Sequence, residues 1–133
     1  MSNWPALLSP HFNLSEFQCP CCQQTKVNPK LVIALEWLRK VVSDHVSDPA
    51  ITISKGGGYR CEKYNASLKG ASPQSQHLFG SGADIRVAGM TPQYLADCAE
   101  TVPYFENGGI GIYDVHIHVD VRDTGRARWD NRS

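Results

Sequence analysis

The stretch Asp114-Val-His-Ile-His-Val-Asp-Val-Arg122 decides the fold more than any other part of the chain. Apolar and polar residues alternate through it, and this period of two predicts a β-strand with one face on the core. The apolar face would hold four aliphatic residues, Val115, Ile117, Val119 and Val121. The other face would carry Asp114, His116, His118, Asp120 and Arg122. Its two imidazoles would lie about 7 Å apart, measured between Cα atoms.

A second stretch, Ser75-Gln-His-Leu-Phe-Gly-Ser-Gly-Ala-Asp84, places a histidine and an aspartate seven positions apart. The residues from Ala83 to Val87 alternate as well, which predicts a neighbouring strand with Asp84 on its polar face. Gly80 and Gly82 would let the preceding loop turn tightly, because glycine accepts backbone angles that other residues resist. We therefore expect His77 to lie over Asp84.

Histidine and aspartate are typical zinc ligands in hydrolytic enzymes, where three N or O ligands leave the fourth position for water. The two stretches together thus predict one zinc ion per chain. Spacing alone does not decide between His116 and His118, since alternate residues of one strand can both bind a metal. If both did, four protein ligands would close the site and favour a structural role.

The motif from Ser75 to Asp84 resembles the S-x-H-x-x-G-x-A-x-D signature of the zinc D-Ala-D-Ala carboxypeptidases, metallopeptidases that cut peptidoglycan stem peptides. The resemblance extends over residues 11–129. It includes His11-Phe-Asn-Leu-Ser-Glu-Phe17, Gly58-Tyr-Arg60 with Asn65, and the segment from Gly108-Gly-Ile-Gly-Ile-Tyr113 to Arg128-Trp129. Where the family commonly has S-G-Y-R, this chain reads Ser54-Lys-Gly-Gly-Gly-Tyr-Arg60, three residues longer.

The resemblance implies a role for each matching residue. His77, Asp84 and His118 would bind zinc, and His116 would be catalytic, moving protons between water and the leaving amine. Arg60 would anchor a substrate carboxylate, which a planar guanidinium can bind through two hydrogen bonds.

Other residues near these motifs carry weaker expectations. Ser75 would bind near the metal or the substrate, although a plain turn serine explains it equally well. Tyr113, beside the histidine-bearing strand, is expected at the substrate cleft. Asp114 or Asp120 could orient His116, and the sequence does not say which.

The rest of the chain predicts a single α+β domain with a mainly antiparallel sheet packed against helices. Asn28 and Pro29 would begin a helix with Leu31, Leu35, Leu38 and Val42 on its apolar side. Residues 49–54 would form a strand, residues 91–101 a second helix, and Asn107-Gly-Gly would precede a final pair of strands. Residues 1–27 are expected to form an N-terminal arm packed on the core.

Composition limits the classes of partner. The 133 residues include 13 basic and 13 acidic side chains, so a broad positive field for nucleic acid is not expected. The sequence also predicts no membrane span and a chain made in the cytoplasm without a signal peptide. Because peptidoglycan lies outside the membrane, we expect a monomeric phage or prophage lysin that reaches the cell wall after release.

The cysteines allow three interpretations. Cys19-Pro-Cys-Cys22 contains a C-x-x-C spacing, and Cys61 follows Arg60 directly. A thioredoxin-like redox role would need a βαβ setting, which this segment lacks. A zinc ribbon would need a second C-x-x-C, which the sequence does not contain. We favour Cys61 facing the N-terminal cysteines, either as a packing contact or as a disulfide.

Two functions from different classes fit the sequence. The first is a zinc peptidase that hydrolyses an amide bond in peptidoglycan peptides, as carboxypeptidase or endopeptidase. The alternative is a non-catalytic zinc-containing module, because the D,D-peptidase-like zinc fold resembles that of Hedgehog signalling domains. His116 and Arg60 favour the enzyme, since a site that has lost catalytic activity needs neither residue.

Overall fold

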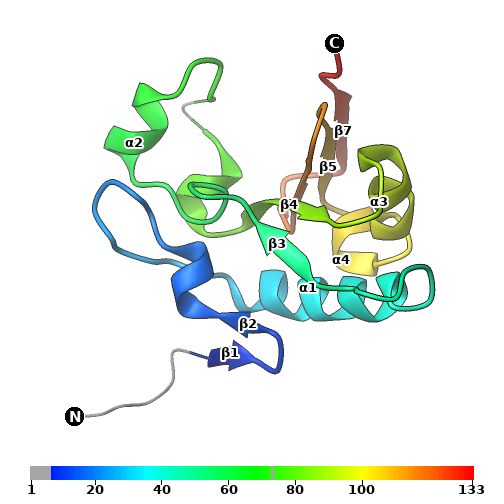
Figure 1. The fold of residues 1–133 in the computed structure, drawn as a ribbon. Helices are drawn as coiled ribbons and strands as arrows, with labels where there is room; N and C mark the ends of the chain where they lie inside the picture. The colour runs from blue at the N-terminus through cyan, green and yellow to red at the C-terminus, as the bar shows by residue number, and fades with distance from the viewer. Residues whose placement is uncertain (1–6, 73) are drawn as a thin grey trace.

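A five-stranded sheet organises the computed structural model, which describes residues 7–72 and 74–133. In spatial order its strands are β3 (Ile51–Ile53), β4 (Gly82–Val87), β6 (Ile117–Asp120), β5 (Gly109–Ile112) and β7 (Ala127–Asp130). The first four are antiparallel neighbours, whereas β7 runs parallel to β5. The sheet is therefore mainly antiparallel, and the expected α+β fold is confirmed (Figure 1).

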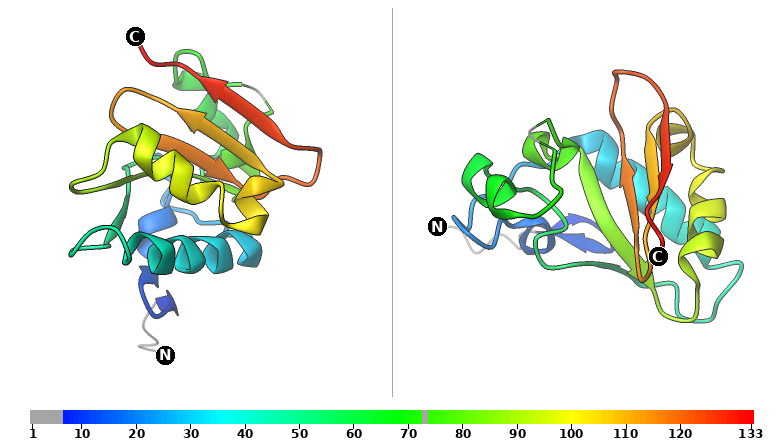
Figure 2. Two further views of the ribbon diagram at one scale, coloured as in Figure 1. Left: turned by 90° about the vertical axis from the view of Figure 1, so that its right-hand side faces the viewer. Right: turned by 90° about the horizontal axis from the view of Figure 1, so that it is seen from above.

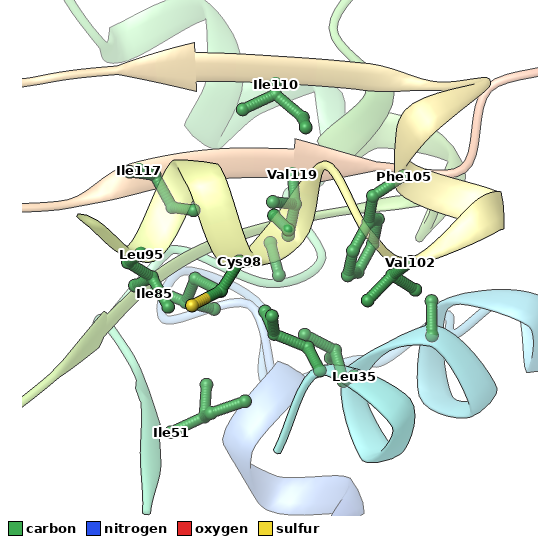
Figure 3. Close-up of a cluster of buried hydrophobic side chains, with 14 of the residues drawn as sticks. Leu35, Ile51, Ile85, Leu95, Cys98, Val102, Phe105, Ile110, Ile117 and Val119 are labelled. Carbon is green, nitrogen blue, oxygen red and sulfur yellow. The ribbon is translucent and has the colours of Figure 1, made fainter. Parts of the chain in front are cut away.

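Three helices cover one face of this sheet: α1 (Pro29–Val42), α3 (Pro92–Ala99) and α4 (Pro103–Glu106). Helices α3 and α4 contact β5 and β6 directly, and α1 packs across both helices (Figure 2). The hydrophobic core lies between these layers, as Figure 3 shows. Its members come from every layer and include Leu35, Ile85, Leu95, Phe105 and Val119.

The helix boundaries follow from local side chains. Asn28 accepts a hydrogen bond from the Lys30 backbone N–H, and Pro29 occupies the first turn, where its missing N–H is harmless. Thr91 caps α3 in the same way. The expected apolar side of α1 is fully buried, with Leu31, Leu35, Leu38 and Val42 each 0% exposed. The short helix α4 and the parallel strand β7 were not expected.

Loops, α2 (Glu62–Ser67) and the 3₁₀ helix η2 (Gln76–Phe79) lie on the other side of the sheet, where η2 contacts β4. Figure 2 shows α2 on the side of the sheet away from α3 and α4. The N-terminal segment adds a small hairpin of β1 (Leu7–Ser9) and β2 (Phe12–Asn13), then η1 (Leu14–Phe17).

Phe12 and Phe17 of this segment lie in the core. That residues 1–27 form a separate N-terminal arm stays a prediction, and residues 1–6 lie outside the part of the chain that the structure describes. In that part, none of the helices combines the length and apolar character that crossing a bilayer requires.

One predicted strand begins later than expected. Residues 113–116 form a turn, closed by a hydrogen bond of 2.9 Å from the Tyr113 N–H to the His116 carbonyl. The turn is needed because β5 and β6 are antiparallel and Ile112 pairs with Ile117. Val115 therefore lies at the tip of a hairpin, 74% exposed, and its expected place on the apolar face is wrong.

Candidate metal centre

Sheet register brings Asp84 and His118 together. Asp84 on β4 pairs directly with His118 on β6, while the flanking pairs Ala83 with Val119 and Ile85 with Ile117 are buried in the core. Because alternate residues of a strand point to opposite faces, both polar side chains point away from α3 and α4. The alternation in the sequence predicted this arrangement.

His77 reaches the same place from η2. The Ser75 hydroxyl accepts a hydrogen bond from the His77 N–H, and Gly80 ends the 3₁₀ helix with a φ of 69°. A β-carbon at Gly80 would lie 2.3 Å from the Lys26 carbonyl oxygen, so the turn requires glycine in space as well as in angle. His77 Nε2 lies 3.3 Å from Asp84 Oδ1, as the glycine-rich loop predicted.

His77, Asp84 and His118, the His/Asp triad, have the geometry of a metal site. Their ligand atoms all lie within 4.8 Å of one another. His118 Nδ1 and His77 Nε2 are 3.2 and 3.3 Å from the same carboxylate oxygen of Asp84. Ligands about 2.0–2.1 Å from a tetrahedral zinc lie about 3.3 Å from each other, so the donor set fits zinc in type and spacing.

The second nitrogen of each imidazole is also held. His77 Nδ1 lies 2.8 Å from the Gly58 carbonyl oxygen, and His118 Nε2 lies 2.7 Å from Asp120 Oδ2. Such partners fix the tautomer and the ring orientation of metal-binding histidines. The nitrogens directed at Asp84 are thereby the ones left to bind a metal.

Asp120 is anchored more firmly than any other carboxylate of this region. It is 0% exposed and accepts hydrogen bonds from the Gly109 N–H and from Nε and Nη2 of Arg122. The structure therefore pairs Asp120 with His118 rather than with His116. Asp114, the other residue considered for orienting His116, accepts from Ser133 instead.

The electrostatics of the triad suit a cation. Burial would raise the pKa of Asp84, but hydrogen bonds from His118 and His77 outweigh it and hold that pKa far below its usual range. Burial lowers the pKa of His77, despite the nearby Asp84. Burial would also lower the pKa of His118, yet Asp120 and Asp84 raise it. Asp84 is anionic and can bind a metal ion directly. At His118 a proton competes with the metal ion for the imidazole nitrogen, because its pKa is raised.

A cavity of about 350 Å³ opens over the triad. Its lining includes Arg60, Ser75, Tyr113, Arg122 and Trp129. The longer loop before Arg60 helps to hold its side chain in place. Arg60 Nε donates to the Gly56 carbonyl in this loop, and Nη2 donates to Asp84 Oδ2 at 3.0 Å. These two bonds use only two of the five N–H donors of a guanidinium.

His116 is not a member of the triad, and it is not among the residues that line the cavity over the triad. It is half-buried in the turn before β6, and its ring stacks on Tyr113 with centroids 4.5 Å apart. Tyr113 in turn accepts a hydrogen bond of 2.9 Å from Trp129 Nε1. Burial lowers the pKa of His116, and Asp84 partly opposes that effect.

Three contributors were missed by sequence reasoning. Asp120 was considered for His116, and its role at His118 could have been found, since it follows His118 by two residues and shares its face. The Gly58 carbonyl had no sequence signal. Trp129, for which no site role was predicted, lies on β7 opposite Gly111, where a β-carbon would be 2.2 Å from the indole ring. The bare backbone of Gly111 lets Trp129 reach His118, with ring centroids 5.2 Å apart.

Comparison with known families gives a match over most of the chain. The family model described as Peptidase M15 matches residues 10–120, which include the whole triad, Arg60 and His116. A search of curated proteins finds no match. The family match confirms the resemblance on which the site assignments were based.

Proposed function

We propose that this chain, which belongs to the peptidase M15 family, hydrolyses an amide bond in the stem or cross-link peptides of peptidoglycan. The family is one of zinc peptidases, so membership makes the chain a zinc peptidase in this broad sense. The observation that carries the finer proposal is a metal-type triad facing a cavity that also exposes a guanidinium.

The triad and the residues around it would have separate chemical roles. His77, Asp84 and His118 would hold zinc, which when bound supplies a water activated near neutral pH and polarises a carbonyl. His116, outside the triad, would act as the general acid or base that moves protons between water and the leaving amine. Asp120 would keep His118 in the tautomer that leaves Nδ1 free to bind.

Arg60 would recognise a substrate carboxylate in the cavity. Its side chain is 14% exposed and fixed by Gly56 and Asp84, so it is pre-oriented rather than free in solvent. Replacement of Arg60 by lysine keeps the charge but not the planar fork, and we expect it to raise KM more than it lowers kcat. If the Arg60→Lys variant had the same KM as the unchanged protein, Arg60 would not be a substrate-binding residue.

Defined peptidoglycan fragments test the proposed reaction. Zinc-loaded protein is incubated with stem peptides that end in a free carboxylate and with cross-linked dimers, and the products are weighed by mass spectrometry. We expect cleavage that EDTA abolishes and zinc restores. Cleavage of the stem peptide alone would indicate a carboxypeptidase, and cleavage of the dimer an endopeptidase. A folded, zinc-loaded chain that cleaves neither would be the non-catalytic module.

His116→Ala separates catalysis from metal binding. We expect kcat to fall about 100- to 10,000-fold, the usual contribution of a general acid or base, with zinc content and melting temperature unchanged. Loss of zinc in this variant would instead make His116 a ligand.

The biological setting is part of the same proposal. We propose a monomeric phage or prophage lysin that acts on the cell wall after release. This setting is supported by the substrate class, since peptidoglycan lies outside the membrane. Two measurements test it: lysis of outer-membrane-permeabilised cells by added protein, and the mass of the protein in solution.

A further inference from the structure

We propose that Cys19, Cys22 and Cys61, the cysteine cluster, hold a second zinc ion with a structural role. The three sulfur atoms all lie within 4.8 Å of one another, although Cys61 is 42 residues from Cys19. The sequence predicted one zinc per chain, so this proposal raises the content to two.

Sulfur spacing favours a metal over a disulfide. Cys19 Sγ and Cys61 Sγ are 3.7 Å apart. Thiolates about 2.3 Å from a tetrahedral zinc lie about 3.8 Å from each other, whereas a disulfide brings its sulfurs to about 2.05 Å. A disulfide would also leave the third thiol of the cluster unpaired.

The backbone around the cluster supports thiolate ligands. The Cys61 N–H points to Cys19 Sγ at 3.5 Å, and the Tyr64 N–H points to Cys61 Sγ at 3.4 Å. Such N–H groups compensate negative charge on sulfur. Cys19 is fully buried, and Cys22 and Cys61 are half-buried, so the site is closed rather than open to a substrate.

A tight turn shapes the N-terminal half of the cluster. The Gln23 N–H donates to the Cys19 carbonyl at 2.9 Å, and Gln23 takes a φ of 60°, which is uncommon for a residue other than glycine. This turn folds Cys22 back beside Cys19. Of the two other cysteines, Cys98 lies in the core on α3, whereas Cys21 lies in the turn, exposed and outside the cluster, where a change of side-chain rotamer would be needed for it to act as the fourth ligand.

The cysteine cluster lies next to Arg60, which lines the cavity. Arg60 directly precedes Cys61, and its backbone N–H donates to the His77 carbonyl at 3.1 Å. The Tyr59 N–H donates to the Phe17 carbonyl at 2.9 Å, two residues before Cys19. A metal at the cluster would therefore tie the N-terminal segment to the loop that carries Arg60.

Metal analysis of the full-length protein tests the proposal. We expect two zinc ions per chain in the unchanged protein, and one each in Cys61→Ser and in His118→Ala. The matched control Cys98→Ala removes a cysteine from α3 and should keep two. Loss in Cys61→Ser alone identifies the cysteine cluster independently of the His/Asp triad. One zinc in the unchanged protein, with no loss in Cys61→Ser, would overturn the proposal.

Two measurements cover the case in which a cysteine variant does not fold. A mercurial thiol reagent added to the unchanged protein should release one zinc per chain, and release of none would contradict a thiolate site. Cobalt substitution should give a sulfur-to-cobalt charge-transfer band that persists in His118→Ala. An intact mass lower by two hydrogens, with no such band, would show a disulfide instead.

Discussion

The His/Asp triad and the cysteine cluster bring three ligand side chains together by different means. Two members of the triad sit on directly paired strands, and the register of the sheet sets their separation. The cysteine cluster joins a tight turn to the residue that caps α2, without any strand. The triad faces a cavity, whereas the cluster is largely covered. A scaffold that is rigid without metal suits chemistry, and a scaffold of loops gains most from a crosslink.

The largest expected effect follows from removing the carboxylate of the triad. Asp84→Ala takes away the oxygen that both imidazoles approach, and we expect the loss of one zinc and at least about a 1,000-fold fall in kcat/KM. Because strand pairing does not need this side chain, the protein should stay folded. Peptide hydrolysis, metal analysis and circular dichroism provide the measurements.

His45→Ala is the matched control for the triad. His45 contacts Tyr94 and lies outside both clusters, so zinc content and activity should not change. Full activity in Asp84→Ala would show that the triad is not the reaction centre.

Chelation should separate the two clusters in time. EDTA reaches the triad through its cavity, and we expect activity to disappear while one zinc and the native circular dichroism spectrum remain. The zinc of the cysteine cluster should leave only after thiol modification or unfolding. Simultaneous loss of both ions would mean that the two sites do not differ in accessibility.

Asp120→Asn should weaken the triad without removing a ligand. The amide can still contact His118 but carries no charge, and we expect zinc affinity at the triad to fall about 10- to 100-fold. Competition with a coloured chelator measures this affinity. Asp123→Asn, at an exposed position just beyond Arg122, should leave it unchanged. Equal affinities in both variants would contradict a supporting role for Asp120.

The smallest expected effect lies outside both clusters, at the Glu100–Arg128 ion pair between the end of α3 and β7. Hydrogen bonds from Arg128 outweigh partial burial and lower the pKa of Glu100. Its stabilisation is therefore present above the unfolded pKa of about 4.3 and is lost as the pH falls through the lower folded value. Because Glu100 is 38% exposed, we expect at most about 1 kcal/mol.

Urea unfolding of Glu100→Gln and the unchanged protein measures this difference at several pH values. The free energies of unfolding should differ at pH 7 and converge in acid. A difference that grows as the pH falls would contradict the sign.

The sequence predicted those parts of the site that depend on strand periodicity and glycine. Period two placed His118 opposite the core, and Gly80 accounted for the return of His77 to Asp84. It did not predict β7, because a strand parallel to β5 is specified by tertiary pairing rather than by a hairpin signal. For the same reason Trp129 was not expected in the cavity.

The roles proposed for His116 and Arg60 came from the family resemblance and remain predictions. Local pattern failed at residues 113–116, where alternation continued through a turn. Pairing of Ile112 with Ile117 required the chain to reverse there, and that requirement overrode the pattern. The proximity of Cys61 to the N-terminal cysteines was favoured from the sequence, but the 3.7 Å between Cys19 Sγ and Cys61 Sγ is known only from the structure.

The pairing of Asp84 with His118 has a consequence for length changes in the gene. One codon inserted or deleted between Ile117 and His118 would turn His118 inward and expose Val119, because every residue of the strand beyond the change moves to the other face. The hairpin tip around Val115 has no such constraint, since that residue is 74% exposed. Homologous chains should accordingly vary in length at this tip and keep an unbroken residue count between Ile117 and Asp120.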